Sequence, residues 1–338
     1  MTWLVWRQHR HQASLAAAAL AAFAVLLLVT GRQMASQYQS AHAACAASHT
    51  CGNLANSLSL GSPVLFLLVT LTLLVPCLLG VFWGGPLVAR ELETGTSQFA
   101  WTQSITRRRW LTAKVGWALL AAAAWGGAVS ALVTWWSSPV NALNQQSFTP
   151  GQFDTQGIVP AGYALFAVAL GITAGALLRR TLPALAITVG VFAALRIVIT
   201  AYVRPHYMSA RTILYKFGDL RPRPTGSYWV ISRGVVGPGG HALSGQPQGV
   251  SDVSGVARQS IAINGVPVSN MPSACRALVF QGPIKAISCL TAHGYRASIT
   301  YQPASRYWAF QSIETGIFVA LAAALIAVTV LVVLRRDA

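Results

Sequence analysis

Charged side chains are scarce in this chain of 338 residues. Only 9% of the residues are Asp, Glu, Lys or Arg, 54% are apolar, and the mean hydropathy is +0.53. An ordinary soluble domain carries about 25% charged residues, so this chain has too few to cover a globule of its size. Its apolar residues instead fall in blocks of about 20, the length that crosses a bilayer core. The composition therefore excludes a soluble enzyme and predicts a polytopic membrane protein.

Acidic residues are the scarcest charges, and none lies inside a predicted span. The seven are Glu91, Glu93, Asp154, Asp219, Asp252, Glu314 and Asp337. Proton-coupled carriers relay protons through intramembrane Asp, Glu or His. The lack of such acids counts against a secondary carrier.

Sequence motifs for nucleotide or metal catalysis are also missing. The three lysines are Lys114, Lys216 and Lys285, and none follows a glycine. The phosphate-binding pattern GxxxxGK[ST] is therefore absent, as are H-E-x-x-H and G-x-S-x-G. We expect no catalytic residue, cofactor or metal on this chain.

Basic residues are in large excess, with 24 Lys and Arg against seven acids and a net charge of +17. In a soluble protein this excess would indicate a nucleic-acid partner. Membrane proteins, however, concentrate Lys and Arg at the ends of their spans. The chain has no basic helix interleaved with base-stacking aromatics, so we expect no nucleic-acid partner.

Six segments are long and apolar enough to cross a membrane. The first could be read as a signal peptide, but no small-residue cleavage site follows it. The predicted spans are Ala13–Val29, Val64–Phe82, Val115–Trp135, Ala161–Leu178, Leu182–Tyr202 and Thr315–Leu334.

The distribution of Lys and Arg predicts that both termini are cytoplasmic in a plasma (inner) membrane. Short connections on one side hold Arg7, Arg90, Arg107–Arg109, Arg179 and Arg335, whereas those on the other side hold only Arg32. The segment 203–311, between spans five and six, is then extracytoplasmic. Its arginines do not contradict this orientation, because long segments translocate largely regardless of charge.

Four of the five cysteines fall in segments predicted to be outside, where disulfides persist. Local pairing would join Cys45 to Cys51 and Cys275 to Cys289, one of three connectivities. For the first pair a zinc site is the alternative, because His42 and His49 complete a cluster with ligand-like spacing.

The segment 203–311 is rich in Gly, Pro, Ser and Arg and predicts a small, mostly β domain. Asn264–Gly265 between apolar residues is typical of a hairpin turn. Further strand candidates are Tyr228–Ile231, Ala277–Phe280, Ile287–Leu290 and Arg296–Tyr301. The predicted fold class is therefore an all-α polytopic membrane protein with six transmembrane helices and this domain inserted between helices five and six.

One charge falls within a predicted span. Arg196 lies six residues from the outer end of the fifth span, roughly 9 Å deep at 1.5 Å per residue. It either snorkels to the headgroups or forms an outer-gate pair with Glu314, just before the sixth span.

The connection between spans two and three is the most informative stretch. Gly84, Gly85 and Pro86 end the span, and Leu87–Leu92 predicts a short helix that presents Arg90, Glu91 and Glu93. A helix of this kind across the membrane face would offer fixed charges to a soluble partner. Arg107–Arg109 alone are explained by membrane topology.

This stretch, "GGPLVARELETGTSQFAWTQSITRRRW", resembles the cytoplasmic loop of type-2 ATP-binding-cassette (ABC) exporter permeases, particularly an actinobacterial group. The later "YQPASRYWAFQSIETG" (301–316) is also similar to that group. With the six spans, the resemblance covers nearly the whole chain. Simple members of the family have a short connection between helices five and six, whereas about 109 residues intervene here.

The resemblance implies a membrane subunit that forms a dimer, with a second copy or a paralogue, on two ATP-binding subunits. The loop that docks into the ATPase corresponds to Arg90, Glu91, Glu93, Gly95 and Thr96. Trp3, Trp6, Arg7 and Arg10 correspond to the interfacial helix of the family, which suits the lipid headgroup layer. ATP and Mg²⁺ would bind the partner subunit. The expected domains are 1–202, 203–311 and 312–338.

Two further features leave the function open. Gly171 and Gly175 form a GxxxG pattern in the fourth span, which would serve either a dimer interface or packing within one protomer. The main alternative function is a membrane-anchored sensor or binding protein that acts through its outer domain. A secondary carrier comes second and an immunity protein that occupies lipid targets without transport comes third. The substrate could be a drug-like amphiphile, a peptide or a lipid.

Overall fold

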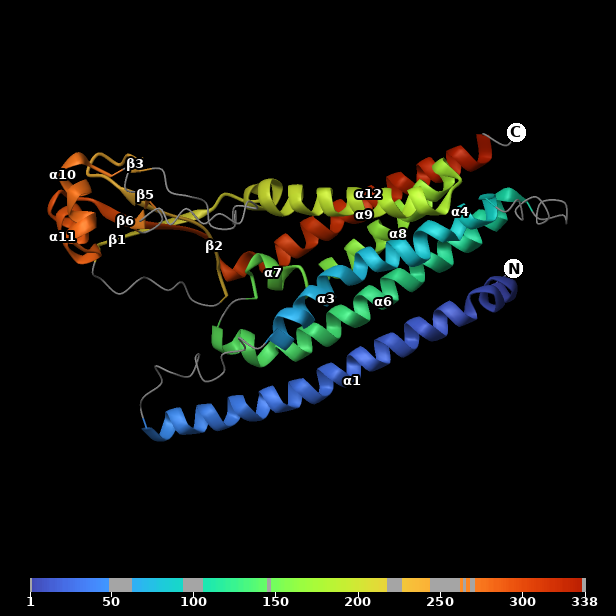
Figure 1. Cartoon of the computed structure of the whole chain (residues 1–338), viewed down its shortest axis with the longest axis horizontal. Coiled ribbons are helices and arrows are strands. Elements are labelled where there is room, and N and C mark those ends of the chain that lie inside the picture. The colour runs from blue at the N-terminus through green and yellow to red at the C-terminus, as the bar shows by residue number, and fades with distance from the viewer. Residues whose placement is uncertain are drawn as a thin grey trace. The chain divides into compact units, whose positions relative to one another are not determined.

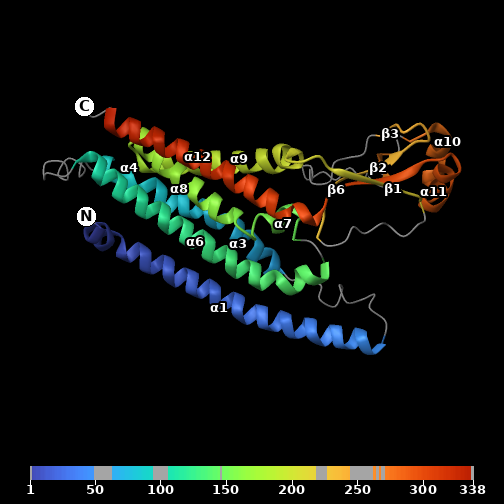
Figure 2. The same cartoon turned by 180° about the vertical axis from the view of Figure 1, so that it is seen from behind.

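A computed structural model describes residues 2–48, 63–93, 106–144, 147–217, 227–243, 262–263, 266–267 and 271–335. The chain divides into two units, a helical one made of 1–144, 151–197 and 309–338, and a second made of 145–150 and 198–308. Figures 1 and 2 show the elements of both units.

The helical unit contains long helices separated by short elements. In chain order they are α1 (Thr2–Ser48), α3 (Pro63–Leu79), the π-helical turn η1 (Gly80–Gly84), α4 (Gly85–Glu93), α6 (Arg107–Asn144), α7 (Pro150–Phe153), α8 (Val159–Leu178), α9 (Thr181–Val198) and α12 (Tyr307–Arg335).

Six segments of these helices are long and apolar enough to cross a membrane, which confirms the predicted set. They are Ala17–Gln37, Thr70–Glu91, Arg108–Ser138, Val159–Leu178, Thr181–His206 and Ala304–Arg335. The first belongs to α1, which continues without a break from Thr2 through the span to Ser48. The stretch predicted as an interfacial helix is thus continuous with the first span, because no Gly or Pro interrupts residues 2–30.

Helix α8 forms the centre of the helical unit. Sixteen of its twenty residues are buried, and it packs against α3, η1, α4 and α6. Helix α1 contacts α6 and runs along the outside of the bundle (Figures 1 and 2). Apolar side chains that are exposed along α9 and α12, such as Leu182, Ile197 and Leu331, have the composition expected of lipid-facing surface.

The second unit contains a four-stranded antiparallel sheet in the order β1-β6-β2-β3. The strands are β1 (Arg211–Tyr215), β2 (Trp229–Val236), β3 (Ala242–Leu243) and β6 (Arg296–Gln302). A small hairpin of β4 (Ala262–Ile263) and β5 (Val266–Pro267) confirms the hairpin predicted around Asn264–Gly265. The strands predicted at 228–231 and 296–301 are confirmed by β2 and β6.

Two predicted strands of this unit are wrong. Residues 277–280 lie in a 3₁₀ helix (Ala277–Gln281), and residues 287–290 lie in α11 (Pro283–Ala292). Gly282, with φ 130°, and Pro283 at the first helical position start α11, a placement that favours helix. Ala286 and Leu290, four residues apart, are both buried in the core of the unit, so their spacing follows a helical face. With α10 (Ser273–Arg276), the unit mixes helix and strand.

Candidate functional site

Glu91 joins α4 to α6 through an ion pair with Lys114. The two side chains are 17% and 4% exposed, and the Lys114 ammonium lies 4.9 Å from the centre of the Trp110 ring. Removing one partner of a pair that is shielded from water is strongly destabilising. The ion pair therefore fixes the end of α4 against α6.

Glu93 joins the same end of α4 to the start of α9. Its Oε2 accepts hydrogen bonds from the Thr181 hydroxyl at 2.6 Å and the Thr181 backbone N–H at 3.1 Å. The first N–H groups of a helix have no partner within it, and a carboxylate there is favoured by the helix dipole. These hydrogen bonds, with Arg180 nearby, lower the pKa of Glu93. A side chain of α4 thus caps a different helix.

Glycines bring η1 and α4 against the backbone of α8. A Cβ added at Gly175 would lie 2.7 Å from the Gly85 carbonyl oxygen, and one at Gly84 would lie 2.6 Å from the Val168 carbonyl oxygen. A Cβ at Gly171 would collide with the Gly80 carbonyl oxygen. The GxxxG pattern of α8 therefore serves packing within one protomer, which was one of its two predicted roles.

Helix α4 is consequently tied to three helices at once, by backbone packing to α8 at its start and by charge to α6 and a cap to α9 at its end. Arg90, which directly precedes Glu91, is exposed. A force applied at α4 would reach α6, α8 and α9 directly. Of the predicted docking residues, Gly95 and Thr96 lie outside the described residues.

A second polar cluster lies near the other end of α8 and contains the predicted residues Arg196 and Glu314. Arg196 forms an ion pair with Asp154 at 2.8 Å, and its guanidinium carbon lies 3.8 Å from the centre of the Tyr163 ring. The Tyr163 hydroxyl is within hydrogen-bond distance of Asp154 Oδ1, at 3.1 Å, and of Glu314 Oε1. Tyr163 thus connects the arginine of α9 with the glutamate of α12.

Gln311 extends this cluster into the turn before α8. Its Oε1 accepts the N–H groups of Ile158 and Val159 at 2.9 and 3.0 Å, and its Nε2 donates to the carbonyls of Phe153 and Gln156. Gln311 and Glu314 are fully buried. Burial of polar groups is tolerated when they are hydrogen-bonded, and here the bonds hold α12 to this turn.

The sequence did not single out Lys114, Thr181, Asp154, Tyr163 or Gln311. Lys114 lies in a basic run that topology explains, and Thr181 and Gln311 are polar residues of ordinary type. Asp154 carried the clearest available signal, because it is an acid in a short connection next to a span. Its partner, Arg196, is 42 positions away, and sequence spacing does not reveal such a pair.

The disulfide predicted between Cys275 and Cys289 is present, with a Cα–Cα distance of 5.7 Å. It links α10 to the 3₁₀–α11 segment that replaces the two predicted strands. The predicted pair Cys45–Cys51, and its zinc alternative with His42 and His49, lie outside the residues whose side chains are described. Cys77, within the second span, is a free thiol.

The fold and these contacts define a multi-pass membrane protein in which one helical segment is tied to three others. A family model for ABC-2 membrane transporter related proteins matches residues 17–204, more than half of the chain. The protein belongs to this family of transporter membrane subunits, which confirms the resemblance to type-2 ABC permeases. No curated protein and no solved structure matches the chain.

Proposed function

We propose that this protein is the permease subunit of an ABC exporter. It couples ATP hydrolysis on a separate nucleotide-binding subunit to the efflux of an amphiphilic substrate, either a drug, a peptide or a lipid. The pathway lies in a dimer with a second copy or a paralogous permease. ATP and Mg²⁺ bind the partner, and the chain itself performs no covalent chemistry.

The arrangement of α4 carries this proposal. The exposed Arg90 offers a soluble ATPase a contact point, while Glu91, Glu93 and Gly85 hold the same helix to α6, α9 and α8. When ATP closes the nucleotide-binding subunits, a displacement of α4 moves these three helices together. Such a rigid-body movement would switch the bundle between inward and outward access.

At the other end of the bundle, the cluster of Arg196, Asp154, Tyr163 and Glu314 acts as the outer gate. It joins α9, α8 and α12, and buried charge pairs have two discrete arrangements, made or broken. We expect Arg196→Gln to alter ATP hydrolysis by the purified complex several-fold, with no loss of ATPase binding. Unchanged hydrolysis and unchanged thermal stability would refute the gate.

The coupling role is tested by recovering the tagged chain from its host in mild detergent and identifying bound proteins by mass spectrometry. Glu91 and Glu93 hold α4 to α6 and α9, so the charge is reversed instead at Arg90, the exposed basic residue of α4, as Arg90→Glu. Arg335→Glu makes the same change at an exposed position of α12 and serves as the matched control. We expect an ATPase with a phosphate-binding GxxxxGK[ST] motif to accompany wild type and Arg335→Glu and to be depleted with Arg90→Glu.

Recovery of no ATPase with folded wild-type protein would contradict the proposal. The alternative of a sensor that acts through the sheet-containing unit would then take first place. Equal recovery with Arg90→Glu and wild type would leave an ATPase partner but remove α4 as its docking segment.

A further inference from the structure

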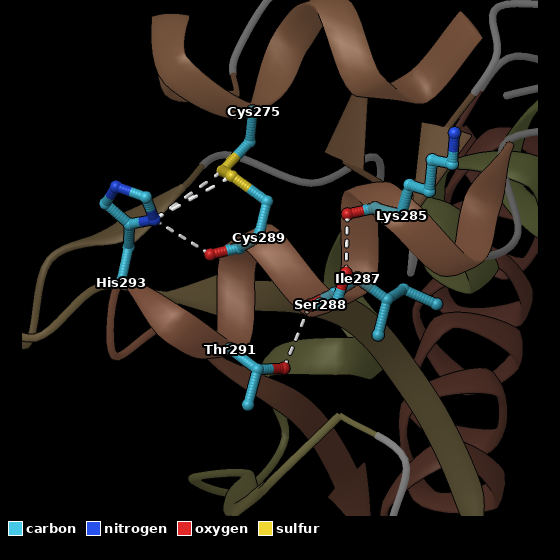
Figure 3. Close-up of a disulfide and its surroundings, with 7 residues drawn as sticks. All are labelled: Cys275, Lys285, Ile287, Ser288, Cys289, Thr291 and His293. Atoms are coloured by element: carbon cyan, nitrogen blue, oxygen red, sulfur yellow. Dashed lines mark hydrogen bonds between the residues drawn. A yellow bond between two sulfur atoms is a disulfide. The ribbon is translucent and has the colours of Figure 1, made fainter. Parts of the chain in front are cut away.

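Three metal-binding side chains meet in the sheet-containing unit. Cys275 lies on α10, Cys289 lies on α11, and His293 follows the end of α11 (Figure 3). Cys275 is fully buried, Cys289 is half-buried and His293 is exposed. Together they form the one group of three or more His, Cys, Asp or Glu side chains with metal-compatible spacing in the described part of the chain.

The imidazole nitrogen is already about as far from each sulfur as two ligands of one metal ion are from each other. His293 Nδ1 lies 3.7 Å from Cys289 Sγ and 4.0 Å from Cys275 Sγ, and all three atoms lie within 4.8 Å of one another. In a tetrahedral zinc site, with Zn–S of about 2.3 Å and Zn–N of about 2.0–2.1 Å, neighbouring ligand atoms are about 3.5–3.8 Å apart. The Cys289–His293 spacing already falls in this range and the Cys275–His293 spacing lies slightly above it, so the main change needed is that the two sulfurs move apart.

We propose that, once the disulfide is reduced, Cys275, Cys289 and His293 bind a divalent cation of the zinc type. Thiolate and imidazole are the ligands that zinc prefers. Three protein ligands leave the fourth position to water or to an incoming group. While the disulfide is intact neither sulfur carries the charge that a metal ligand needs, so the site is gated by oxidation state.

A thiol reductant can supply the electrons that reduce the Cys275–Cys289 disulfide. Two reductant thiols become one disulfide, the Cys275–Cys289 bond breaks, and each cysteine sulfur takes up one proton. Metal binding then releases both protons, because the ligand is the thiolate. Zinc changes no oxidation state in this step.

The surroundings of the group suit this role. Cys275 packs with Val235, Val279 and Leu290 in an apolar core, which anchors one ligand on a rigid element. His293 Nδ1 is 2.9 Å from the Cys289 carbonyl oxygen, a contact that metal binding would replace after the ring proton has moved to Nε2. Because His293 is exposed, the ring has room to make this adjustment.

The site is tested in the purified full chain with Co²⁺ alone as the probe. The background carries Cys45→Ser and Cys51→Ser, which removes the other cysteine and histidine cluster, and the sample is treated with a phosphine reductant. We expect one equivalent of Co²⁺ to bind with thiolate-to-metal absorption and to be displaced by Zn²⁺. Oxidised protein should show no such absorption.

Two variants keep the test decisive. Cys289→Ser should abolish the absorption, and His293→Ala, which leaves both cysteines and the disulfide in place, should weaken Co²⁺ binding. The loss of Co²⁺ affinity should be at least roughly 10–100-fold, which is the usual effect of removing a residue that only hydrogen-bonds to a metal ligand. Cys77→Ala is the control and should bind Co²⁺ as the background protein does.

The proposal would be overturned if reduced, folded protein showed no thiolate absorption, or if His293→Ala bound Co²⁺ as well as the background protein. The outcome is independent of ATPase binding, so this site and the permease role fail separately.

Discussion

Single ionisable residues of the helical unit act by linking helices to one another. Glu91, Glu93 and Arg196 each come from one helix and bind a partner on another helix or turn. An unpartnered charge within a bundle is costly, so Glu91 and Arg196, whose side chains are largely buried, limit how their helices can separate. The chain has few charged residues, and Glu91, Glu93 and Arg196 lie where two helices, or a helix and a turn, contact each other.

Glu93 gives the cap between α4 and α9 a defined pH dependence. Its pKa is lowered from the ordinary value of 4.5 by the Thr181 hydrogen bonds. A group whose pKa is lowered by folding stabilises the fold at pH above its unfolded pKa, and this stabilisation is lost as the pH falls through the folded pKa. At neutral pH the charged cap is therefore fully effective.

We predict that Glu93→Gln lowers the thermal unfolding midpoint at pH 7, because the helix dipole and the Thr181 donors lose a charged acceptor. The difference from wild type should shrink as the pH is lowered from about 5 towards 3, when the wild-type carboxylate also becomes neutral. Thermal unfolding in detergent micelles at several pH values measures this. A gap that stays constant between pH 7 and pH 3 would assign the effect to packing.

At the scale of elements, η1 and α4 meet α8 at a distance that side chains do not permit. Gly80, Gly84 and Gly85 face Gly171 and Gly175 across this contact. Small residues let helix backbones approach closely in membranes, where packing and hydrogen bonds replace the hydrophobic effect as the force between helices. Because of this close packing, α4 must move together with the bundle. A loosely attached loop in its place could move while the bundle stayed still.

Gly171→Ala should consequently destabilise the fold by about 1–3 kcal/mol, the usual cost of overpacking. Gly190→Ala on α9 is the matched control, since no atom of the described residues lies within 4 Å of its added Cβ outside its own turn of helix. That variant should be neutral or more stable by up to about 1 kcal/mol, the gain in helix propensity from Gly to Ala. Unfolding by denaturant in micelles compares the two, and similar effects at both positions would contradict the packing contact.

At the scale of the whole molecule, the family match and the two units divide the chain at nearly the same place. The match covers 17–204, which holds the first four spans and nearly all of the fifth, and the sheet-containing unit takes over from Val198. The sheet and the Cys275–Cys289 disulfide therefore lie outside the matched region. We expect functions particular to this protein to depend on this unit.

The proposed orientation predicts a reactivity pattern towards a membrane-impermeant maleimide on intact cells. In a background of Cys45→Ser, Cys51→Ser and Cys77→Ala, His241→Cys in the sheet-containing unit should be labelled from outside. Arg335→Cys at the end of α12 should be labelled only after the membrane is permeabilised. Both parent residues are exposed, so burial would not protect the new thiols. The reverse labelling pattern would contradict the proposed orientation and show that the termini lie outside.

The sequence by itself determined the class of the protein and its spans. Blocks of about 20 apolar residues have the length that crosses a bilayer core, and few charges are left to cover a soluble globule. The motif around Arg90, Glu91 and Glu93 carried the resemblance to type-2 ABC permeases that the match confirmed. Local chemistry also sufficed for the Asn264–Gly265 hairpin and for the Cys275–Cys289 pair, whose partners are close in the sequence.

Only the tertiary structure decided which distant side chains meet. Glu93 with Thr181, and Arg196 with Asp154 and Tyr163, join residues that are 88, 42 and 33 positions apart. The same limit produced the error at 277–290, where short apolar runs fit a strand or a helix equally well. The packing of Ala286 and Leu290 into one core selected the helix, because burial of a face depends on what lies opposite it and not on the local run of residues.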